Sequence, residues 1–276
     1  MSNLYIPELA RIVGSKEETS SIRTITVSMQ NKKQLTVHPG QFVEMTIFGY
    51  GEFPISVSSI IDNKGAFQTT VQEKGKATNE TRNLKNDTTI GIRGPFGKGF
   101  SLEEMKGKNV YIVTGGIGLA AVWLLLDEIL KDRKHYGSLK LLHGARKPSD
   151  MIYKDSFVFN NQEAKRKGIE VFLTVDDPDK TWKGNVGLVT DLFKKTNITA
   201  DNAVVVLCGP SIMMKYASKI LIDIGFDESQ IILSMERRMQ CGMGVCGHCM
   251  IGEKRVCLEG PVFHYTEIKE SLDKVF

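Results

Sequence analysis

The sequence predicts three parts in chain order: a small antiparallel β-barrel, a parallel α/β domain and a short cysteine-rich C-terminal segment. Short β-rich runs separated by turn residues occupy the first part. At about residue 108 the pattern changes to a strand, a glycine-rich turn and a helix. Four of the five cysteines then lie close together near the C-terminus. We place the domain boundaries at residues 1–103, 104–226 and 227–276.

The length and composition suit a globular protein of two ordinary domains and a small metal-bound appendix. The chain has 276 residues, of which 41% are hydrophobic and 25% charged. Its longest apolar run, residues 119–126, is too short to span a bilayer, and residues 1–8 carry no export signal. Cysteines that hold metal fit a reducing compartment, so we expect a cytoplasmic protein. The formal charge of +4 is not gathered into a basic block, which gives nucleic-acid binding little support.

The barrel is predicted from short strands with regular spacing. The breakers His38-Pro39-Gly40 and Gly94-Pro95-Phe96-Gly97 are expected at its corners. The expected strands are residues 22–27, 41–47, 66–71 and 88–93.

The α/β domain is predicted from strands that alternate with helical stretches, a pattern typical of right-handed βαβ units. A strand over residues 109–114 is followed by a glycine turn at 115–118 and a helix that reaches Leu130. Further strands are expected at residues 138–145, 169–175 and 203–208, with a helix over 211–224.

The cysteines follow the spacing C-x4-C-x2-C-x7-C, and the first three match the plant-type [2Fe-2S] ligand run. The glycines between them, Gly242, Gly244 and Gly247, can take positive φ and turn backbone N–H groups toward the cluster. A four-cysteine zinc site is the alternative, although it usually contains two C-x2-C pairs. His248 is expected to be solvated or to lie behind the ligands. The ligands expected are Cys241, Cys246, Cys249 and Cys257.

Two segments are candidates for binding a pyridine dinucleotide. The glycine turn between the first α/β strand and its helix lets a pyrophosphate approach the helix N-terminus. A later strand of the same sheet ends at a Cys-Gly-Pro sequence, and ligands of such sheets bind at the carboxyl ends of strands. A simple packing turn would explain either segment as well. The candidates are Thr114, Gly115, Gly116, Ile117 and Gly118, with Cys208, Gly209 and Pro210.

Two segments of the barrel are candidates for binding a flavin. A serine-containing run offers a hydroxyl at Ser56, and a Gly-Lys-Ala-Thr sequence resembles a helix start that can receive a pyrophosphate. Serine-rich strands and threonine caps are also common without any ligand. The candidates are Pro54, Ile55, Ser56 and Val57, with Gly75, Lys76, Ala77 and Thr78.

The order of these motifs resembles the ferredoxin reductase-like superfamily with a C-terminal cluster. The resemblance rests on Pro-Ile-Ser-Val-Ser at 54–58, Gly-Gly-x-Gly at 115–118, Cys-Gly-Pro at 208–210 followed by Met213 and Met214, and the four-cysteine run. The tail over residues 236–263 is most similar to the group formed by the electron-transfer component of anaerobic sulfite reductase and the sulfhydrogenase gamma subunits. The electron-transfer subunit of dihydroorotate dehydrogenase is a more distant relative.

The resemblance implies an FAD-binding barrel, an NAD(P)-binding domain and a [2Fe-2S] domain, which together form the diaphorase subunit of a larger complex. A nicotinamide gives two electrons as a hydride and a cluster accepts one at a time, so a flavin must link them. No acid–base pair is required. Cys208 would face the nicotinamide and Ser56 would lie near the flavin. The expected partner is an iron–sulfur or other redox subunit, which holds the terminal substrate site.

The resemblance is incomplete at the flavin site. Phe53 and Gln72 stand where the superfamily often has arginines, which leaves Lys74 or Lys76 to meet the FAD phosphates. We therefore expect FAD to be held more weakly than in relatives.

Several points stay open at the sequence level. Arg146 and Lys147 follow the second α/β strand and could meet a 2′-phosphate, but an exposed basic turn explains them equally, so NADH and NADPH are not distinguished. The alternative functions are a nucleotide-binding regulator with a zinc-bound tail and a self-contained NAD(P)H-dependent reductase. If a partner docks at the cluster, the expected apolar contacts are Met239, Met243, Val245 and Met250.

Overall fold

The computed structural model describes residues 4–32, 35–62 and 64–272. The chain divides into two compact units. The first comprises Met1–Phe100, Ala120–Leu125 and Glu236–Val262, and the second comprises Ser101–Leu119, Leu126–Met235 and Phe263–Phe276. Within the described residues, no helix is both long enough and apolar enough to cross a membrane.

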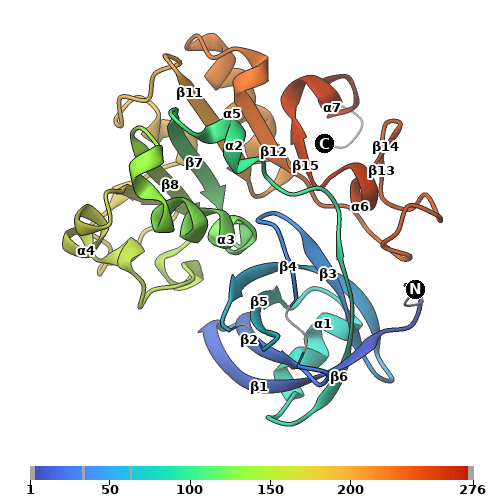
Figure 1. Cartoon of the computed structure of the whole chain (residues 1–276). Helices are drawn as coiled ribbons and strands as arrows, with labels where there is room; N and C mark the ends of the chain where they lie inside the picture. The colour runs from blue at the N-terminus through green and yellow to red at the C-terminus, as the bar shows by residue number, and fades with distance from the viewer. Residues whose placement is uncertain (1–3, 33–34, 63, 273–276) are drawn as a thin grey trace. The chain divides into compact units, whose positions relative to one another are not determined.

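The first unit contains a closed antiparallel barrel with the strand order β1-β2-β5-β4-β3-β6 (Figure 1). The four predicted strands are all present, which confirms the barrel. Two strands were not predicted, because β1 is long, charged and mostly exposed, and β4 contains Pro54. The strands are β1 (Glu8–Thr19), β2 (Ile22–Met29), β3 (Phe42–Ile47), β4 (Gly51–Ile60), β5 (Ala66–Gln72) and β6 (Thr89–Phe96).

The barrel core is filled by inward-facing apolar residues from all six strands, among them Ile12, Ile25, Met45, Phe67 and Ile92. One expectation about the corners is wrong. The segment Gly94-Pro95-Phe96 lies inside β6, where the pairing with β3 shifts register, and not in a turn between strands. A register shift lets a strand carry breakers such as glycine and proline.

The second unit is built on a seven-stranded sheet with the order β10-β9-β8-β7-β11-β12-β15 (Figure 1). The pairs from β10 to β12 are parallel, as predicted. The strands are β7 (Asn109–Gly115), β8 (Leu139–Ala145), β9 (Glu170–Val175), β10 (Asn185–Val186), β11 (Ala203–Cys208), β12 (Ile231–Ser234) and β15 (Val262–His264).

Two long helices follow the strands that carry the predicted nucleotide motifs. α3 (Gly118–Lys131) follows β7, and α5 (Ser211–Asp223) follows β11, close to the predicted bounds. The other helices are short: α1 (Lys76–Glu80), α2 (Leu102–Met105), α4 (Asn161–Arg166), α6 (Val256–Glu259) and α7 (Tyr265–Leu272). Single 3-10 turns are η1 (Thr81–Asn83), η2 (Arg133–His135), η3 (Pro148–Asp150), η4 (Phe157–Phe159), η5 (Val189–Leu192) and η6 (Glu228–Gln230).

The cysteine segment forms a loop, a small hairpin of β13 (Met250–Ile251) and β14 (Lys254–Arg255), and helix α6. Within the predicted C-terminal part, β12 and β15 belong to the seven-stranded sheet. The boundaries at 103/104 and 226/227 stay a prediction about functional domains.

Candidate functional site

The two predicted nucleotide segments meet at the carboxyl ends of β7 and β11. Thr114 and Cys208 are register partners in this parallel pair, so the turns that follow them start side by side. A Cβ on Gly118 would clash with the carbonyl oxygen of Cys208, and one on Gly115 would lie 2.5 Å from the sulfur of Met213. These two glycines therefore allow the close packing of the two turns, which is the packing alternative considered for this motif.

Gly116 differs from its neighbours because a Cβ there would meet no atom within 4 Å. Its φ is +55°, and its N–H donates to the carbonyl of Gly144 at 2.9 Å. Ile117 then begins α3, and no side chain caps the free N–H groups of its first turn. Open space beside an uncapped N-terminus of a long helix suits a phosphate group.

A polar row crosses this sheet at the same level. Ser234, Cys208, Thr114 and His143 are successive register partners on β12, β11, β7 and β8. The Nδ1 atom of His143 lies 2.8 Å from the hydroxyl of Thr114, and both side chains are fully buried. Burial lowers the pKa of His143 to about 4, and a hydrogen bond with the Thr114 backbone opposes this shift. Sequence reasoning missed His143, although a histidine inside the apolar strand Leu-Lys-Leu-Leu-His-Gly-Ala was a visible signal.

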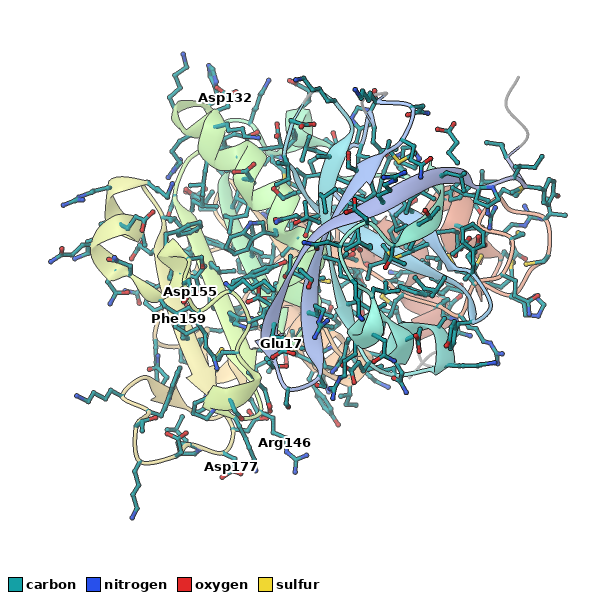
Figure 2. All side chains as sticks on the ribbon, turned by 90° about the horizontal axis from the view of Figure 1, so that it is seen from below. Glu17, Asp132, Arg146, Asp155, Phe159 and Asp177 are labelled. Atoms are coloured by element: carbon teal, nitrogen blue, oxygen red, sulfur yellow. The ribbon has the colours of Figure 1, made fainter. Side chains whose placement is uncertain are left out.

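The basic turn after β8 lies beside acidic residues that follow β9. Arg146 and Asp177 are neighbours at this end of the sheet, where the N–H of Asp177 donates to the carbonyl of Arg146 at 2.8 Å (Figure 2). The ammonium of Lys147 is 3.5 Å from the Asp177 carboxylate, and both side chains are exposed. Burial raises the pKa of Asp176, and Arg146 counteracts it. The turn is thus a mixed-charge surface.

The flavin candidates of β4 lie on the strand that pairs with β3. Pro54, Ile55 and Ser56 are half-buried and face Glu44, Val43 and Phe42 across the ladder. The side chain of Val57 is fully buried in the barrel core, so only its backbone is available to a ligand. Phe53 is also a core residue, which explains why this position carries no cation.

The second flavin candidate is the start of α1, which packs against β4. The Thr78 hydroxyl accepts from the N–H groups of Lys74 at 3.0 Å and of Gly75 at 2.8 Å, and it donates to the Gly75 carbonyl. Thr78 therefore shapes the turn with its hydroxyl. Ala77 packs against the barrel core. The N–H groups of the first turn point toward any pyrophosphate held there.

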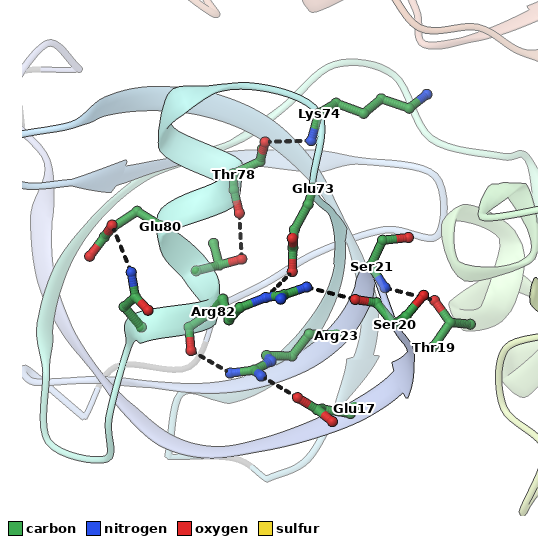
Figure 3. A network of polar contacts seen from close by, with 12 residues as sticks. Glu17, Thr19, Ser20, Ser21, Arg23, Glu73, Lys74, Thr78, Glu80 and Arg82 are labelled. Carbon is green, nitrogen blue, oxygen red and sulfur yellow. Dashed lines mark hydrogen bonds and ion pairs between the residues drawn. The ribbon is translucent and has the colours of Figure 1, made fainter.

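A polar network anchors this segment to the barrel (Figure 3). Arg82, just after α1, donates to Glu73 at 2.9 Å and to the carbonyl of Ser20 at 2.6 Å. Arg23 donates to the carbonyl of Arg82 at 2.9 Å and to Glu17 at 2.8 Å. Arg82 is thereby committed to protein groups on both sides of the turn.

Lys76 is the cation placed on the helix start itself. Its ammonium lies 5.9 Å from the centre of the Tyr50 ring, a cation–π contact at the turn between β3 and β4. Sequence reasoning did not identify Tyr50. The only hint was an exposed aromatic residue between two glycines, Gly49 and Gly51.

The cysteine loop has the backbone that its glycines predicted. Gly242, Gly244 and Gly247 have φ values of +73°, +80° and +75°, which confirms the expected turns. The N–H of Gly244 donates to the sulfur of Cys257 at 3.0 Å. The sulfur of Cys241 receives the N–H groups of Met243, Val245 and Cys246 at 3.3–3.5 Å. Such donors stabilise thiolate ligands.

The four thiols differ in exposure and in acidity. Cys249 and Cys257 are buried with their sulfurs 3.3 Å apart, and burial raises the pKa of Cys257 to about 12. Cys246 is exposed, and hydrogen bonds from the backbone, led by that of His248, lower its pKa. The side chain of His248 is exposed, as expected. Within the described residues, no three His, Cys, Asp or Glu side chains converge on a single metal ion. Four cysteines with inward N–H donors fit a binuclear cluster, whose thiolates are shared between two irons.

Charged residues of the barrel hold this loop. Arg93 donates to the carbonyls of Cys241 at 2.9 Å and Leu4 at 3.1 Å, and it pairs with Glu52. Burial would raise the pKa of Glu52, but hydrogen bonds from Arg93 and Thr46 outweigh it, and this pKa is lowered.

Glu44 lies next to this pair and touches the loop. A Cβ on Gly242 would be 3.0 Å from its Cγ, and its Oε1 atom is buried without a hydrogen-bond partner. Burial, with help from Glu52 and against Arg93, raises the pKa of Glu44 to about 8. An uncharged carboxyl therefore faces the loop at neutral pH. Sequence reasoning missed both charges, although each interrupts an apolar strand.

Comparison with known proteins agrees with these three positions. Residues 112–219 match the oxidoreductase NAD-binding domain, and residues 236–269 match the iron–sulfur cluster binding domain of dihydroorotate dehydrogenase B. Sulfhydrogenase 2 subunit gamma of Pyrococcus furiosus is 33% identical, over 96% of this chain and 97% of its own length. A probable electron transfer subunit of dihydroorotate dehydrogenase B (NAD(+)) from Methanothermobacter thermautotrophicus is 30% identical, over 97% and 92%.

A solved structure shows the same fold over nearly the whole chain. It comes from work on flavin-based electron bifurcation by the NADH-dependent reduced ferredoxin-NADP oxidoreductase, with 26% identity and a TM-score of 0.75, over 99% of this chain and 95% of that one. The expected fold class, oxidoreductase activity and cofactors (FAD, a [2Fe-2S] cluster and NAD or NADP) are thereby confirmed. The chain belongs to the ferredoxin reductase-like family of electron-transfer subunits, which includes sulfhydrogenase gamma subunits and the electron-transfer subunits of dihydroorotate dehydrogenase B.

Proposed function

We propose that this chain moves electrons between NAD(P)H and a partner redox subunit, with each cofactor held by the residues described above. The observation that carries the proposal is the cysteine loop, in which backbone N–H groups point at the sulfurs of Cys241 and Cys257. A loop of this kind is suited to hold a [2Fe-2S] cluster as a one-electron carrier. The ligands are Cys241, Cys246, Cys249 and Cys257.

The dinucleotide site lies at the carboxyl ends of β7 and β11. Gly116 and the first turn of α3 receive the pyrophosphate, because a Cβ at Gly116 would meet open space and no side chain caps the helix. Cys208, with Gly209 and Pro210, orients the nicotinamide. The mixed charges around Arg146 and Asp177 do not select between NADH and NADPH by themselves.

The flavin site lies on β4 and the start of α1. Pro54, Ile55 and Ser56 offer half-buried surface, and the turn closed by Thr78 presents its N–H groups. Lys76 supplies the cation that Phe53 and Gln72 do not. When bound, FAD takes up two electrons as a hydride and releases them singly, and the chain supplies position and potential.

The terminal reaction belongs to a partner subunit. Val245 and Leu258 are exposed apolar side chains beside the cluster ligands, and they suit a docking surface for that subunit. The use of cysteines as metal ligands fits a reducing compartment, so we place the complex in the cytoplasm.

Anaerobic purification of the chain tests this function. We expect bound FAD, about two irons and two sulfides per chain, NAD(P)H oxidation with an artificial dye, and co-purification of a redox subunit. A colourless protein with zinc and no iron would contradict the proposal and support the regulator alternative. An isolated monomer that reduces a physiological small molecule at full rate would support the self-contained reductase.

A further inference from the structure

We propose that His143 is a positioning residue, which acts on Cys208 through the hydroxyl of Thr114. The inference deepens the nicotinamide site and rests on the function proposed above. It assigns a role to a buried polar side chain that no cofactor-binding motif contains. The evidence is the register of the sheet, the hydrogen bond between His143 and Thr114, and the unpaired nitrogen of His143.

The register puts the three side chains in one line. Thr114 pairs with Cys208 on one side and with His143 on the other. In-register residues of parallel strands project from the same face, and neighbouring strands are about 4.8 Å apart. The corresponding row two residues earlier on this face is entirely apolar: Ile232, Val206, Ile112 and Leu141. Polar side chains thus enter this face only where the strands reach the nucleotide turns.

The unpaired nitrogen identifies the tautomer of His143. Its Nε2 atom is buried and has no hydrogen-bond partner, whereas its Nδ1 atom lies 2.8 Å from the Thr114 hydroxyl. A buried N–H without a partner costs more than a buried acceptor without one. The proton therefore resides on Nδ1, and Nε2 is the bare nitrogen. The ring stays neutral at physiological pH, because burial lowers its pKa to about 4.

This tautomer determines the direction of the Thr114 hydroxyl. Since His143 donates to the hydroxyl oxygen, the hydroxyl proton must point away from β8. The side chain of Thr114 is fully buried, so water cannot take up that proton. On the other side of the row lies Cys208, whose sulfur can accept a weak hydrogen bond. His143 thereby orients Thr114 toward Cys208, and Cys208 in turn orients the nicotinamide.

Rapid mixing with NAD(P)H tests the chain of contacts. In H143F the ring keeps its size but loses the donor, so we expect flavin reduction at saturating NAD(P)H to slow about tenfold, with KM changed less than about threefold. H143N retains an N–H near the position of Nδ1 and should stay within about threefold of the wild-type rate. T114V should behave as H143F does, whereas T114S should retain most of the rate.

A double-mutant cycle separates positioning from general damage. If His143 acts through Cys208, the H143F/C208A variant should be no slower than C208A alone, within about twofold. Independent, multiplicative losses would overturn the inference. So would equal losses in H143F and H143N, since a purely structural role would not distinguish a donor from its absence.

The tautomer is measured directly on the wild-type protein. Nitrogen-15 NMR of labelled histidine, assigned by comparison with H143N, should show a protonated Nδ1 and a bare Nε2 that do not titrate between pH 5 and 8. A protonated Nε2 would overturn the inference, even if every variant folded poorly. A wild-type chain that shows this tautomer but no NAD(P)H-dependent flavin reduction would refute the proposed function instead.

Discussion

Arg93 of the barrel donates a hydrogen bond from Nη1 to the carbonyl oxygen of Cys241, at 2.9 Å. The two residues are far apart in the sequence, and the bond ties the first cluster ligand to strand β6. Arg93 is only 7% exposed and also binds Leu4 and Glu52. The barrel therefore holds the start of the cluster loop as well as the flavin candidates.

Replacing Arg93 with methionine should loosen this loop. Glu52 and the carbonyl of Cys241 lose a charged donor in a mostly buried place, which we expect to cost about 1–3 kcal/mol of stability. The visible absorption of the cluster should decay faster in the presence of an iron chelator. The matched control is R11M, because Arg11 and Asp87 form an exposed pair at 3.9 Å. That variant should change stability by less than about 0.5 kcal/mol. Equal cluster lifetimes in both variants would contradict the role of Arg93.

Replacing Cys246 or Cys249 with serine should remove the cluster and stop electron delivery to the partner. NAD(P)H oxidation with a dye that takes electrons from the flavin should partly survive, because the cluster lies after the flavin in the proposed order. The measurements are iron content, visible spectrum and dye reduction on the same preparation. Normal iron content and partner reduction in both variants would show that the ligands are wrongly assigned.

Replacing Gly116 with valine should raise KM for NAD(P)H at least about tenfold, or about 1.4 kcal/mol of binding. The protein itself leaves open space at this position, so crowding would fall on the ligand. G107V is the control, since Gly107 also has positive φ, +74°, and open space around a Cβ. Both variants carry similar backbone strain, and only G116V should lose nucleotide affinity. Loss of FAD with unchanged KM in G116V would mean that the two cofactors are assigned to the wrong domains.

Replacing Val245 with glutamate should weaken assembly with the partner while FAD and iron are retained. Val245 is 69% exposed on the cluster loop, and a charge there would be buried without a partner in the complex. I61E places the same charge on a barrel residue that is 51% exposed, and it should leave assembly intact. Affinity is measured by co-purification and by size-exclusion chromatography. Equal loss of assembly in the two variants would argue against a docking surface at the cluster.

The buried His143 predicts how stability depends on pH. Its pKa is about 4 in the folded protein and 6.5 when solvated, so between these values only the unfolded chain takes up a proton. Wild-type stability should fall as pH drops from 6.5 to 4, by up to about 1.4 kcal/mol per pH unit from this group. H143N lacks this contribution, so the wild-type advantage should shrink over the same range. Urea unfolding at pH 7, 6 and 5 measures it, and parallel curves for the two proteins would be inconsistent with a buried neutral histidine.

The sequence alone determined the chemistry that its local patterns carry. Cysteine spacing and loop glycines predicted the cluster segment, since the positive φ values of Gly242, Gly244 and Gly247 are a local backbone requirement. Alternating strands and helices predicted the parallel sheet, and the strand bounds of β11 matched the prediction because its apolar run ends at a clear breaker. The segments that close on each other at Thr114 and Cys208 could be paired because the carboxyl ends of parallel strands share one edge.

Only the tertiary structure decided which polar side chains serve these segments from a distance. The contacts of Arg93 with Cys241 and of Glu44 with Gly242 join residues that no local pattern relates, and strand register alone brings His143 beside Thr114. The strands β1 and β4 were also missed, because an exposed charged strand and a strand that contains proline gain their stability from pairing with neighbours. Long-range pairing depends on the whole fold, and so do the burial and the pKa values of the groups it encloses.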